Sequence, residues 1–433
     1  MSFRGLQRRG FLGGLGAAAF AGGAFSPAAM LRAQANGNTD PVRLLLGSHM
    51  DYLAALTDAY AERFGAQPTV DMITTPDLPV RLNSSFIARR DVGDAVFSTA
   101  QLCVGLAERE WLTDLTDLVN DKLLPNGLLP NSLTAATFND RIYGVPVTIG
   151  CPIMHWNKDL LEAADLDPEA PANWHAEPGS WDKMVEYAKA ITDPDNNIYG
   201  ITDNWGGTGS IFTFGALIQM HGGSLLDGAQ NPVMNSDAGV EALTRMVELM
   251  HDHQVVDPSV TTYTWVFDAS PGYLAGRRGF FFTWPFISGI ANTSEDSAVQ
   301  GRSGAAPNPS VLTSASVDGS EYLTVPVFAR NPEGGRQFIE LATSLEKQIL
   351  QGSTSPWAPS IEGALGHPDV QANLPVAEII RQSYLYPVDG GYSADRERWV
   401  EILTGQISRA VNRQSEPRAA LDEAVRQIEA SRG

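Results

Sequence analysis

Three tryptophans stand at irregular points of the chain where a side chain could meet a small molecule. Trp205 precedes a glycine-rich loop, Trp284 stands between a threonine and a proline, and Trp357 follows the run Ser-Thr-Ser-Pro. A core tryptophan usually belongs to a periodic apolar run, as Trp181 does at its predicted helix start. Indole faces in loops instead cover the apolar face of a sugar or hold a cation. Phe286 is an equally good candidate for an aromatic ring that faces a ligand, and the sequence does not decide between Phe286 and Trp284.

Polar side chains follow the predicted strands at the positions where a parallel sheet binds its ligands. His49 and Asp51 come after the first strand, and Ser98 and Gln101 come at the end of the third. Ligands of such sheets bind beyond the carboxyl ends of the strands. We therefore predict a site for a small solute that is made by His49, Asp51, Ser98, Gln101, Asn204, Trp205, Thr208, Trp284, Phe286 and Trp357.

Sequence patterns that carry catalysis are absent. The chain contains no H-E-x-x-H, no G-x-S-x-G and no C-x-x-C. Ser344 opens an S-x-x-K without a K-T-G, and the pair His251 and His253 has no spaced third metal ligand. The loop at 206–209 has neither the P-loop pattern nor a basic neighbour for phosphate. We expect no enzyme, no metal and no cofactor, although a carboxylate pair for glycoside hydrolysis stays open because its separation depends on the fold.

The elements that must position these residues alternate between strands and helices. Val42–Leu46 and Val70–Ile73 are predicted as short strands, and residues 93–99 as a third strand that leads into a helix. This alternation indicates parallel βα units. Because about 400 mature residues exceed a single hydrophobic core, we expect two domains.

The stretch from Tyr143 to Ile201 resembles a known family. Val145–Met154 is an apolar run interrupted by two prolines, which restrict it to a sheet edge or to a crossing between sheets. An Asn-Lys-Asp helix start at 157–159 and a Ser-Trp-Asp helix start at 180–182 follow it. In this order the pieces resemble the extracytoplasmic solute-binding proteins of ABC importers, in the carbohydrate-binding, maltose-binding-protein-like group.

Further pieces extend this resemblance over most of the chain. They are Gly93–Phe97 before a helix, the turn and strand from Gly276 to Phe282, and the terminal helix from Pro417. In the family, the chain crosses between two lobes at three segments, which match Tyr143–Pro152, Ala305–Pro309 and Ser353–Pro359 here.

The resemblance implies an α/β, two-lobed periplasmic binding protein type II fold with a multi-crossing hinge. It divides the chain into a twin-arginine signal peptide at 1–35, lobe one at 36–149 plus 310–355, and lobe two at 150–309 plus 356–433. Within lobe one, a helix is predicted from Glu333 to Leu350, with Leu345 among its inward residues.

The first residues indicate export. Arg8-Arg9 with Phe11-Leu12 form a twin-arginine pattern, and Ala33-Gln34-Ala35 is an A-x-A cleavage signal. No later stretch reaches about 18 consecutive apolar residues, so no membrane span is predicted. We therefore expect a periplasmic protein.

The net charge limits the classes of binding partner, and the surroundings of the two cysteines indicate their redox state. The formal net charge of −20 at pH 7 argues against nucleic acid and anionic membrane surfaces. Cys103 and Cys151 each stand in an apolar segment, which favours buried free thiols over the disulfide that an oxidising compartment allows.

The resemblance implies the periplasmic substrate-binding component of an ABC importer, which closes around a solute and presents it to the membrane permease. We expect a monomer whose solute is a small sugar or polyol. Relatives that bind oligosaccharides place an acid where this chain has Gly150-Cys151, and an aromatic and an acid where it has Ser98 and Gln101. Two alternatives stay open: a receptor for a cationic amine, held by tryptophan faces and an acid such as Asp51, and a periplasmic glycoside hydrolase.

Overall fold

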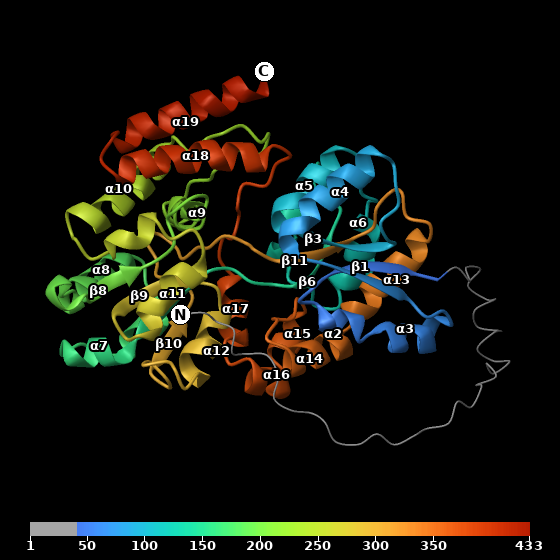
Figure 1. Cartoon of the computed structure of the whole chain (residues 1–433), viewed down its shortest axis with the longest axis horizontal. Coiled ribbons are helices and arrows are strands. Elements are labelled where there is room, and N and C mark those ends of the chain that lie inside the picture. The colour runs from blue at the N-terminus through green and yellow to red at the C-terminus, as the bar shows by residue number, and fades with distance from the viewer. Residues whose placement is uncertain (1–40) are drawn as a thin grey trace.

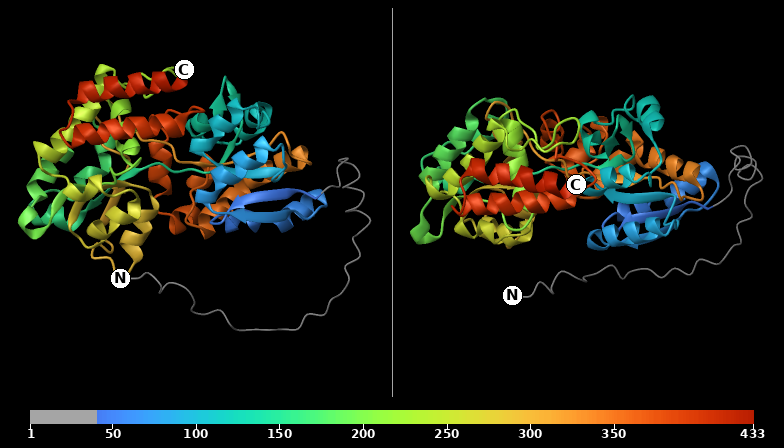
Figure 2. Two further views of the ribbon diagram at one scale, coloured as in Figure 1. Left: turned by 45° about the horizontal axis from the view of Figure 1, so that its top comes forward. Right: turned by 90° about the horizontal axis from the view of Figure 1, so that it is seen from above.

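The computed structural model describes residues 41–433, which fold into two lobes that lie side by side (Figure 1). Seen from above, the two bodies are joined by crossing segments (Figure 2). Each lobe is built around its own sheet. The predicted twin-arginine signal at 1–35 lies outside the described residues. The expected α/β, two-lobed fold is confirmed.

Lobe one is built on a five-stranded sheet. In spatial order its strands are β2 (Thr69–Ile73), β1 (Arg43–Gly47), β3 (Ala95–Thr99), β11 (Glu321–Thr324) and β6 (Val145–Thr148). β1 runs parallel to β2 and β3, whereas β11 runs antiparallel to β3 and β6. Its helices are α2 (Asp51–Ala54), α3 (Thr57–Phe64), α4 (Leu78–Ile87), α5 (Ala100–Glu108), α6 (Thr116–Leu118), α13 (Pro332–Ala342) and α14 (Leu345–Thr354). The three N-terminal strands lie where the sequence predicts them.

Lobe two is built on a four-stranded sheet with the order β10 (Ser303–Ala306), β7 (Ile153–Asn157), β9 (Arg278–Thr283) and β8 (Tyr199–Thr202). Its helices are α7 (Lys158–Ala163), α8 (Ser180–Ile191), α9 (Ser210–Met220), α10 (Asp237–His251), α11 (Val266–Leu274), α12 (Phe286–Thr293), α18 (Arg396–Val411) and α19 (Pro417–Arg432). The two C-terminal helices pack on α10, and α18 also packs on α9 (Figure 1). A short hairpin of β4 (Thr137–Phe138) and β5 (Arg141–Ile142) stands apart from both sheets.

The apolar run Val145–Met154, which the prolines predict to be a sheet edge or a crossing between sheets, forms both. β6, which contains Pro146, lies at the edge of the lobe-one sheet and pairs with β11. An edge strand tolerates proline because one side of its backbone needs no ladder hydrogen bond. The chain then passes through Ile149–Pro152 and enters lobe two as β7. One apolar run therefore supplies a strand to each sheet.

Two further passages join the lobes. Residues 307–320 lead from β10 back to β11, as the family pattern predicts. The segment predicted as the third crossing contacts lobe one, because the backbone N–H of Ile149 donates to the carbonyl of Ala358 at 3.1 Å. After it, α15 (Glu362–Leu365) and α16 (Pro368–Asn373) pack on α14, and α17 (Ala377–Ser383) precedes the passage to α18. The lobe boundaries at 36–149 plus 310–355 and 150–309 plus 356–433 stay a prediction.

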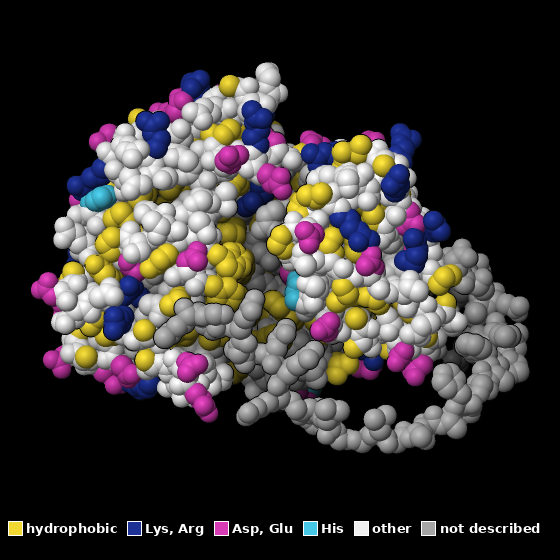
Figure 3. Space-filling view, viewed as in Figure 1, with side chains coloured by type: hydrophobic (Ala, Val, Ile, Leu, Met, Phe, Trp, Pro, Cys, Tyr) yellow, Lys and Arg dark blue, Asp and Glu magenta, His cyan; other side chains and the backbone are white. Residues whose placement is uncertain are grey.

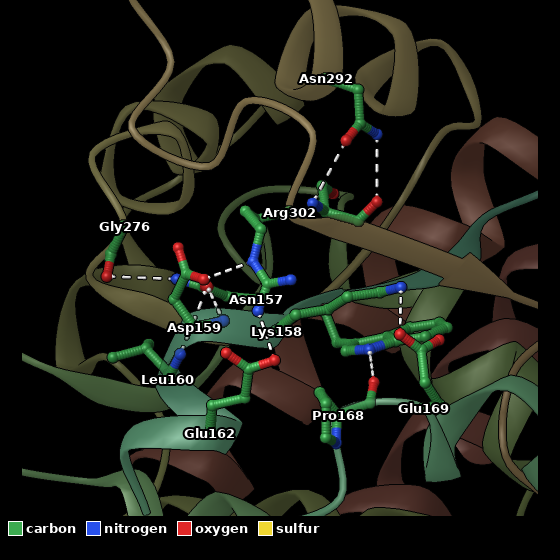
Figure 4. A network of polar contacts seen from close by, with 12 residues as sticks. Asn157, Lys158, Asp159, Leu160, Glu162, Pro168, Glu169, Gly276, Asn292 and Arg302 are labelled. Atoms are coloured by element: carbon green, nitrogen blue, oxygen red, sulfur yellow. Dashed lines mark hydrogen bonds and ion pairs between the residues drawn. The ribbon is translucent and has the colours of Figure 1, made fainter.

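The Asn-Lys-Asp sequence begins α7 as predicted, and side-chain contacts fix this helix to its sheet (Figure 4). The side-chain oxygen of Asn157 accepts from the backbone N–H of Asp159 at 3.0 Å, which caps the helix. Arg302, next to β10, contacts the carboxylates of Asp159 at 2.5 Å and Glu162 at 2.6 Å. These contacts lie on the outside of lobe two, so the role of this motif is structural.

One predicted helix is two helices in the structure. The helix expected from Glu333 to Leu350 is interrupted because Ser344 adopts an extended backbone between α13 and α14, with φ −68° and ψ 145°. The interruption changes the face that the second helix buries. Leu345, which we expected to point inward, is 47% exposed. The prediction of its burial was therefore wrong.

Both cysteines are buried and free. Burial raises the pKa of the Cys103 thiol and of the Cys151 thiol to about 12, because a thiolate loses its hydration there. The interpretation as buried free thiols is therefore confirmed. None of the helices within residues 41–433 combines the length and the apolar sequence that crossing a membrane requires.

Candidate functional site

A cleft of about 580 Å³ lies between the two lobes. Sites that enclose small molecules usually measure about 300–1,000 Å³. Figure 3 shows hydrophobic side chains along the side of one lobe that faces the other. Lobe one contributes His49, Thr75, Pro76, Thr148 and Glu321, and lobe two contributes Trp265, Trp284, Pro285 and Phe286. The remaining lining residues, from the crossings and from α16 and α17, are Ile149, Gly150, Gly319, Pro356, Trp357, Ala358, Leu374 and Ile380.

Four of the predicted site residues meet in this cleft. His49 comes from the loop after β1, and Trp357 comes from the segment after α14. Trp284 follows β9, and Phe286 is the first residue of α12. Both aromatic candidates of that segment therefore line the cleft. Side chains from both lobes converge, which is the arrangement that a ligand needs if it is to hold the lobes together.

The two cleft tryptophans that we predicted have fixed surroundings. The Trp357 ring lies 5.0 Å from the ring of His49, centroid to centroid. The Trp284 ring makes an edge contact with Phe212 at 5.4 Å, and it also packs on the backbone of Gly319. A Cβ at position 319 would lie 2.2 Å from Cη2 of Trp284, so this close approach requires glycine. The hinge segment therefore sets the position of the Trp284 ring.

Four other predicted residues do not line the cleft. Ser98 is fully buried in β3, where its hydroxyl donates to the carbonyl of Thr99 at 3.4 Å. Gln101 lies half-buried in the first turn of α5, and Asp51 and Thr208 are exposed. The strand-end rule identified the correct edge of the sheet. The rule does not predict which side chains at that edge point toward the other lobe.

Trp205 is part of the core of lobe two, where we expected a ligand-facing side chain. It is 4% exposed, and its indole N–H lies 3.0 Å from the Asp203 carboxylate and 3.1 Å from the Thr213 hydroxyl. The loop turns the ring inward because Gly206 packs against the backbone of residues 261–263, where a Cβ would lie 2.8 Å from the Tyr263 carbonyl oxygen. Asn204 lines a second, small cavity of about 30 Å³ that also borders Trp284.

Glu321 is a cleft residue that the sequence prediction missed. It begins β11 and pairs with Thr99 and Thr148 on the neighbouring strands. Its side chain is 17% exposed, and Nε2 of His49 lies 2.8 Å from each of its two oxygens. The signal for it is positional: an antiparallel strand begins where its parallel neighbours end. Its first residue therefore lies at the same sheet edge as His49.

The polar lining of the cleft is sparse. Among the described residues that line it, Glu321 is the one carboxylate, and none is lysine or arginine. The Thr148 hydroxyl is already engaged with Tyr52 at 3.1 Å and with the side-chain amide of Gln351 at 2.9 Å. Glycoside hydrolysis uses two carboxyl groups, and this lining supplies one. Within residues 41–433, no three metal-ligating side chains come together to form a metal site.

The hinge contains a buried carboxylate, Asp318. Its two oxygens accept from the hydroxyls of Ser320 at 2.5 Å, of Tyr322 at 2.8 Å and of Tyr384, while the Tyr392 hydroxyl donates to its backbone carbonyl at 2.5 Å. Burial raises the pKa of this carboxyl to about 6, and the hydroxyl bonds oppose the shift only in part. Tyr384 also accepts from the backbone N–H of residue 150 at 3.1 Å, so this group joins the crossing segments.

Two α/β lobes, three passages between them and an aromatic cleft at strand ends define a two-lobed solute-binding protein. Residues 81–349, more than half of the chain, match the family described as "Bacterial extracellular solute-binding protein". The chain belongs to this family. Membership confirms the resemblance seen in the sequence, and it confirms a binding protein where an enzyme was the alternative.

Solved structures of the same fold support this assignment. A maltose-bound MalE3 of T. maritima is 22% identical with a TM-score of 0.72, and the alignment covers 90% of this chain and 99% of that one. A ribitol complex of an ABC transporter solute-binding protein from Agrobacterium radiobacter K84 is 20% identical with a TM-score of 0.71, covering 89% of this chain and 97% of that one. At these identities the likeness shows the fold.

A curated relative covers less of the chain. The "Probable amino-acid ABC transporter periplasmic-binding protein" of Sinorhizobium fredii is 26% identical over 239 residues, which are 55% of this chain. The chain therefore spans about half of the length of this relative, 52%.

Proposed function

We propose that this protein is the periplasmic substrate-binding component of an ABC importer, and that it captures a small sugar or polyol and delivers it to the membrane permease. The observation that carries the proposal is the aromatic cleft to which both lobes contribute, with Trp357 on one side and Trp284 and Phe286 on the other. The bound maltose and ribitol of the two similar structures support this class of solute.

Binding and closure follow from the same contacts. The aromatic faces remove apolar C–H surface of the solute from water, at about 25 cal/mol per Å² buried. A solute that touches both lobes stabilises the closed arrangement selectively, because the open arrangement offers it only one lobe at a time. The permease is then presented with a population of closed, loaded protein.

The Trp357→Ala variant tests this site. We expect at least a tenfold loss of affinity for the solute, because Trp357 is a partly buried ring that lines the cleft and large aromatic rings dominate such interfaces. The measurement is titration calorimetry with the sugar or polyol that most raises the melting temperature in a thermal-shift panel. Solution scattering of the wild-type protein with the same solute should show a smaller radius of gyration on binding.

Trp111→Ala is the matched control, because Trp111 is half-buried in lobe one and packs on Phe86, away from the cleft. It should keep the solute affinity of the wild type. Equal affinities of the Trp357→Ala variant and the wild type would remove Trp357 from the site. A panel in which no sugar or polyol raises the melting temperature would contradict the proposed function itself.

We propose periplasmic localisation by twin-arginine export, which rests on Arg8-Arg9 and on the A-x-A site at 33–35. Changing Arg8 and Arg9 together to lysine should leave uncleaved precursor in the cytoplasm, because the export machinery reads the arginine pair. Fractionation and immunoblotting measure this, with Arg32→Lys as a control outside the pair. Normal periplasmic accumulation of the double variant would overturn the proposal.

A further inference from the structure

The fixed charge in the cleft is a single carboxylate. Glu321 is the first residue of β11, the strand that lies between β3 and β6 in the lobe-one sheet. None of the described residues that line the cleft is lysine or arginine, so no permanent positive charge faces a solute there. An anionic solute would lose its hydration next to the Glu321 carboxylate, and no lysine or arginine of the lining would offset that desolvation cost.

Glu321 is held in place but keeps capacity to accept further hydrogen bonds. Nε2 of His49 lies 2.8 Å from both carboxylate oxygens, so the two oxygens share one hydrogen-bond partner on the imidazole ring. Two carboxylate oxygens offer about four acceptor positions. The side chain is 17% exposed, and this exposed part belongs to the cleft lining. A donor-rich group of a solute therefore finds an acceptor that is already oriented.

The indole rings of Trp284 and Trp357 line the same cleft as this carboxylate. The Trp357 ring lies 5.0 Å from the ring of His49, which contacts Glu321 directly. The Trp284 ring packs on Gly319, two residues before Glu321 in the chain. Aromatic faces attract cations through the negative potential above the ring, most strongly for tryptophan. A cleft that is lined by one carboxylate and by these indoles is thus suited to an ammonium group.

The rest of the lining offers little to hydroxyl groups. Thr148 already shares its hydroxyl with Tyr52 and Gln351, which leaves Thr75, His49 and the indole N–H donors of the lining tryptophans as the other polar side-chain groups in the cleft. Each hydroxyl that is buried without a partner costs about 1–3 kcal/mol. Replacing one hydroxyl of a sugar or polyol by an ammonium group reduces the number of hydroxyls that need a partner, and it adds a charged group for which Glu321 is an acceptor.

We propose that the solute is an amino sugar or amino polyol, and that its protonated amine binds Glu321 while its C–H faces stack on Trp284 and Trp357. This inference rests on the proposed function and narrows its class of solute. It also replaces Asp51, which is exposed and does not line the cleft, as the acid that would hold an amine.

The experiment compares amine and neutral members of matched pairs. Thermal shift and titration calorimetry are run at pH 7 with glucosamine against glucose and N-acetylglucosamine, galactosamine against galactose, and glucamine against sorbitol. We expect the amine of at least one pair to bind at least tenfold more tightly than its neutral partners. The Glu321→Gln variant keeps the side-chain size but removes the charge, so the amine should lose at least tenfold in affinity and the neutral partner less than threefold.

Two further variants separate charge from general damage. Glu346→Gln makes the same change at a side chain that is 82% exposed on the surface, and it should behave as the wild type. Glu321→Asp keeps a carboxylate at the start of β11, so part of the preference for the amine should survive even if the Glu321→Gln variant is unstable. Loss of the preference in this variant counts against the proposal.

The outcomes distinguish the inference from the proposed function. Neutral sugars or polyols that bind as tightly as the amines, or a Glu321→Gln variant that weakens both equally, would overturn the inference and leave the importer function standing. A panel in which neither neutral nor amine compounds bind would overturn both.

Discussion

The Trp205→Ala variant should lose about 3–5 kcal/mol of its free energy of unfolding, as truncation of a large core aromatic usually does. Trp205 is 4% exposed within the core of lobe two, and its indole N–H has two polar partners. Truncation leaves a cavity and removes the N–H donor from Asp203. Chemical denaturation of the ligand-free protein, followed by intrinsic fluorescence or circular dichroism, measures the change.

The Trp357→Ala variant is the matched comparison for this experiment, because Trp357 is only partly buried and lines the cleft. It should lose little stability and much affinity, whereas the Trp205→Ala variant should show the reverse at temperatures where it stays folded. A Trp205→Ala protein with wild-type stability and weakened binding would show that Trp205 contacts the solute after all.

Removing the Asp318 carboxyl should change how stability depends on pH. Burial raises the pKa of Asp318 from its ordinary value of 3.8 to about 6, so the folded protein retains a proton that the unfolded chain releases. The stabilisation is complete below the unfolded pKa and is lost as the pH rises through about 6. A rise of this size corresponds to about 2 kcal/mol between pH 4 and pH 7.

The measurement is the free energy of unfolding at several pH values for the wild type and for the Asp318→Asn variant. Only the difference between the two curves reports this group, because Asp203 is also buried with a raised pKa of about 6, and surface acids such as Asp117 and Glu423 have lowered pKa values and titrate in the opposite sense. We expect the free energy of unfolding of the wild type to rise by about 2 kcal/mol relative to that of the variant as the pH falls from 7 to 4. Parallel curves would show that folding does not raise the pKa of the hinge carboxyl.

Much of the fold could be predicted from the sequence, because its signals are local. The apolar runs that form β1 and β3 stand next to helical periodicity, and the prolines of Val145–Met154 already restrict that run to an edge and a crossing. The break between α13 and α14 has no such signal. Ser344 interrupts an otherwise continuous helical pattern, and only packing against the rest of lobe one shows where the second helix must turn.

The site was harder to predict because it depends on which way side chains turn. Trp284 and Trp357 stand next to prolines and do reach the cleft, while Trp205 stands next to glycines and turns inward. The difference is the close approach of Gly206 to residues 261–263, a contact between segments that are far apart in the sequence. Glu321 was missed for a related reason: its place at the sheet edge depends on the direction of β11, which pairing alone decides.

The position of β11 also has a consequence for the order in which the protein forms. This strand lies between β3 and β6, yet it is synthesised only after the whole sheet of lobe two. At about 5–20 residues per second, the ribosome needs on the order of ten seconds or more to proceed from β6 to β11. During that interval β6 has no partner, because β11 is the strand with which it pairs. The four strands of the lobe-two sheet can therefore pair while the lobe-one sheet still lacks β11, so the sheet that the chain begins first is the last of the two to close.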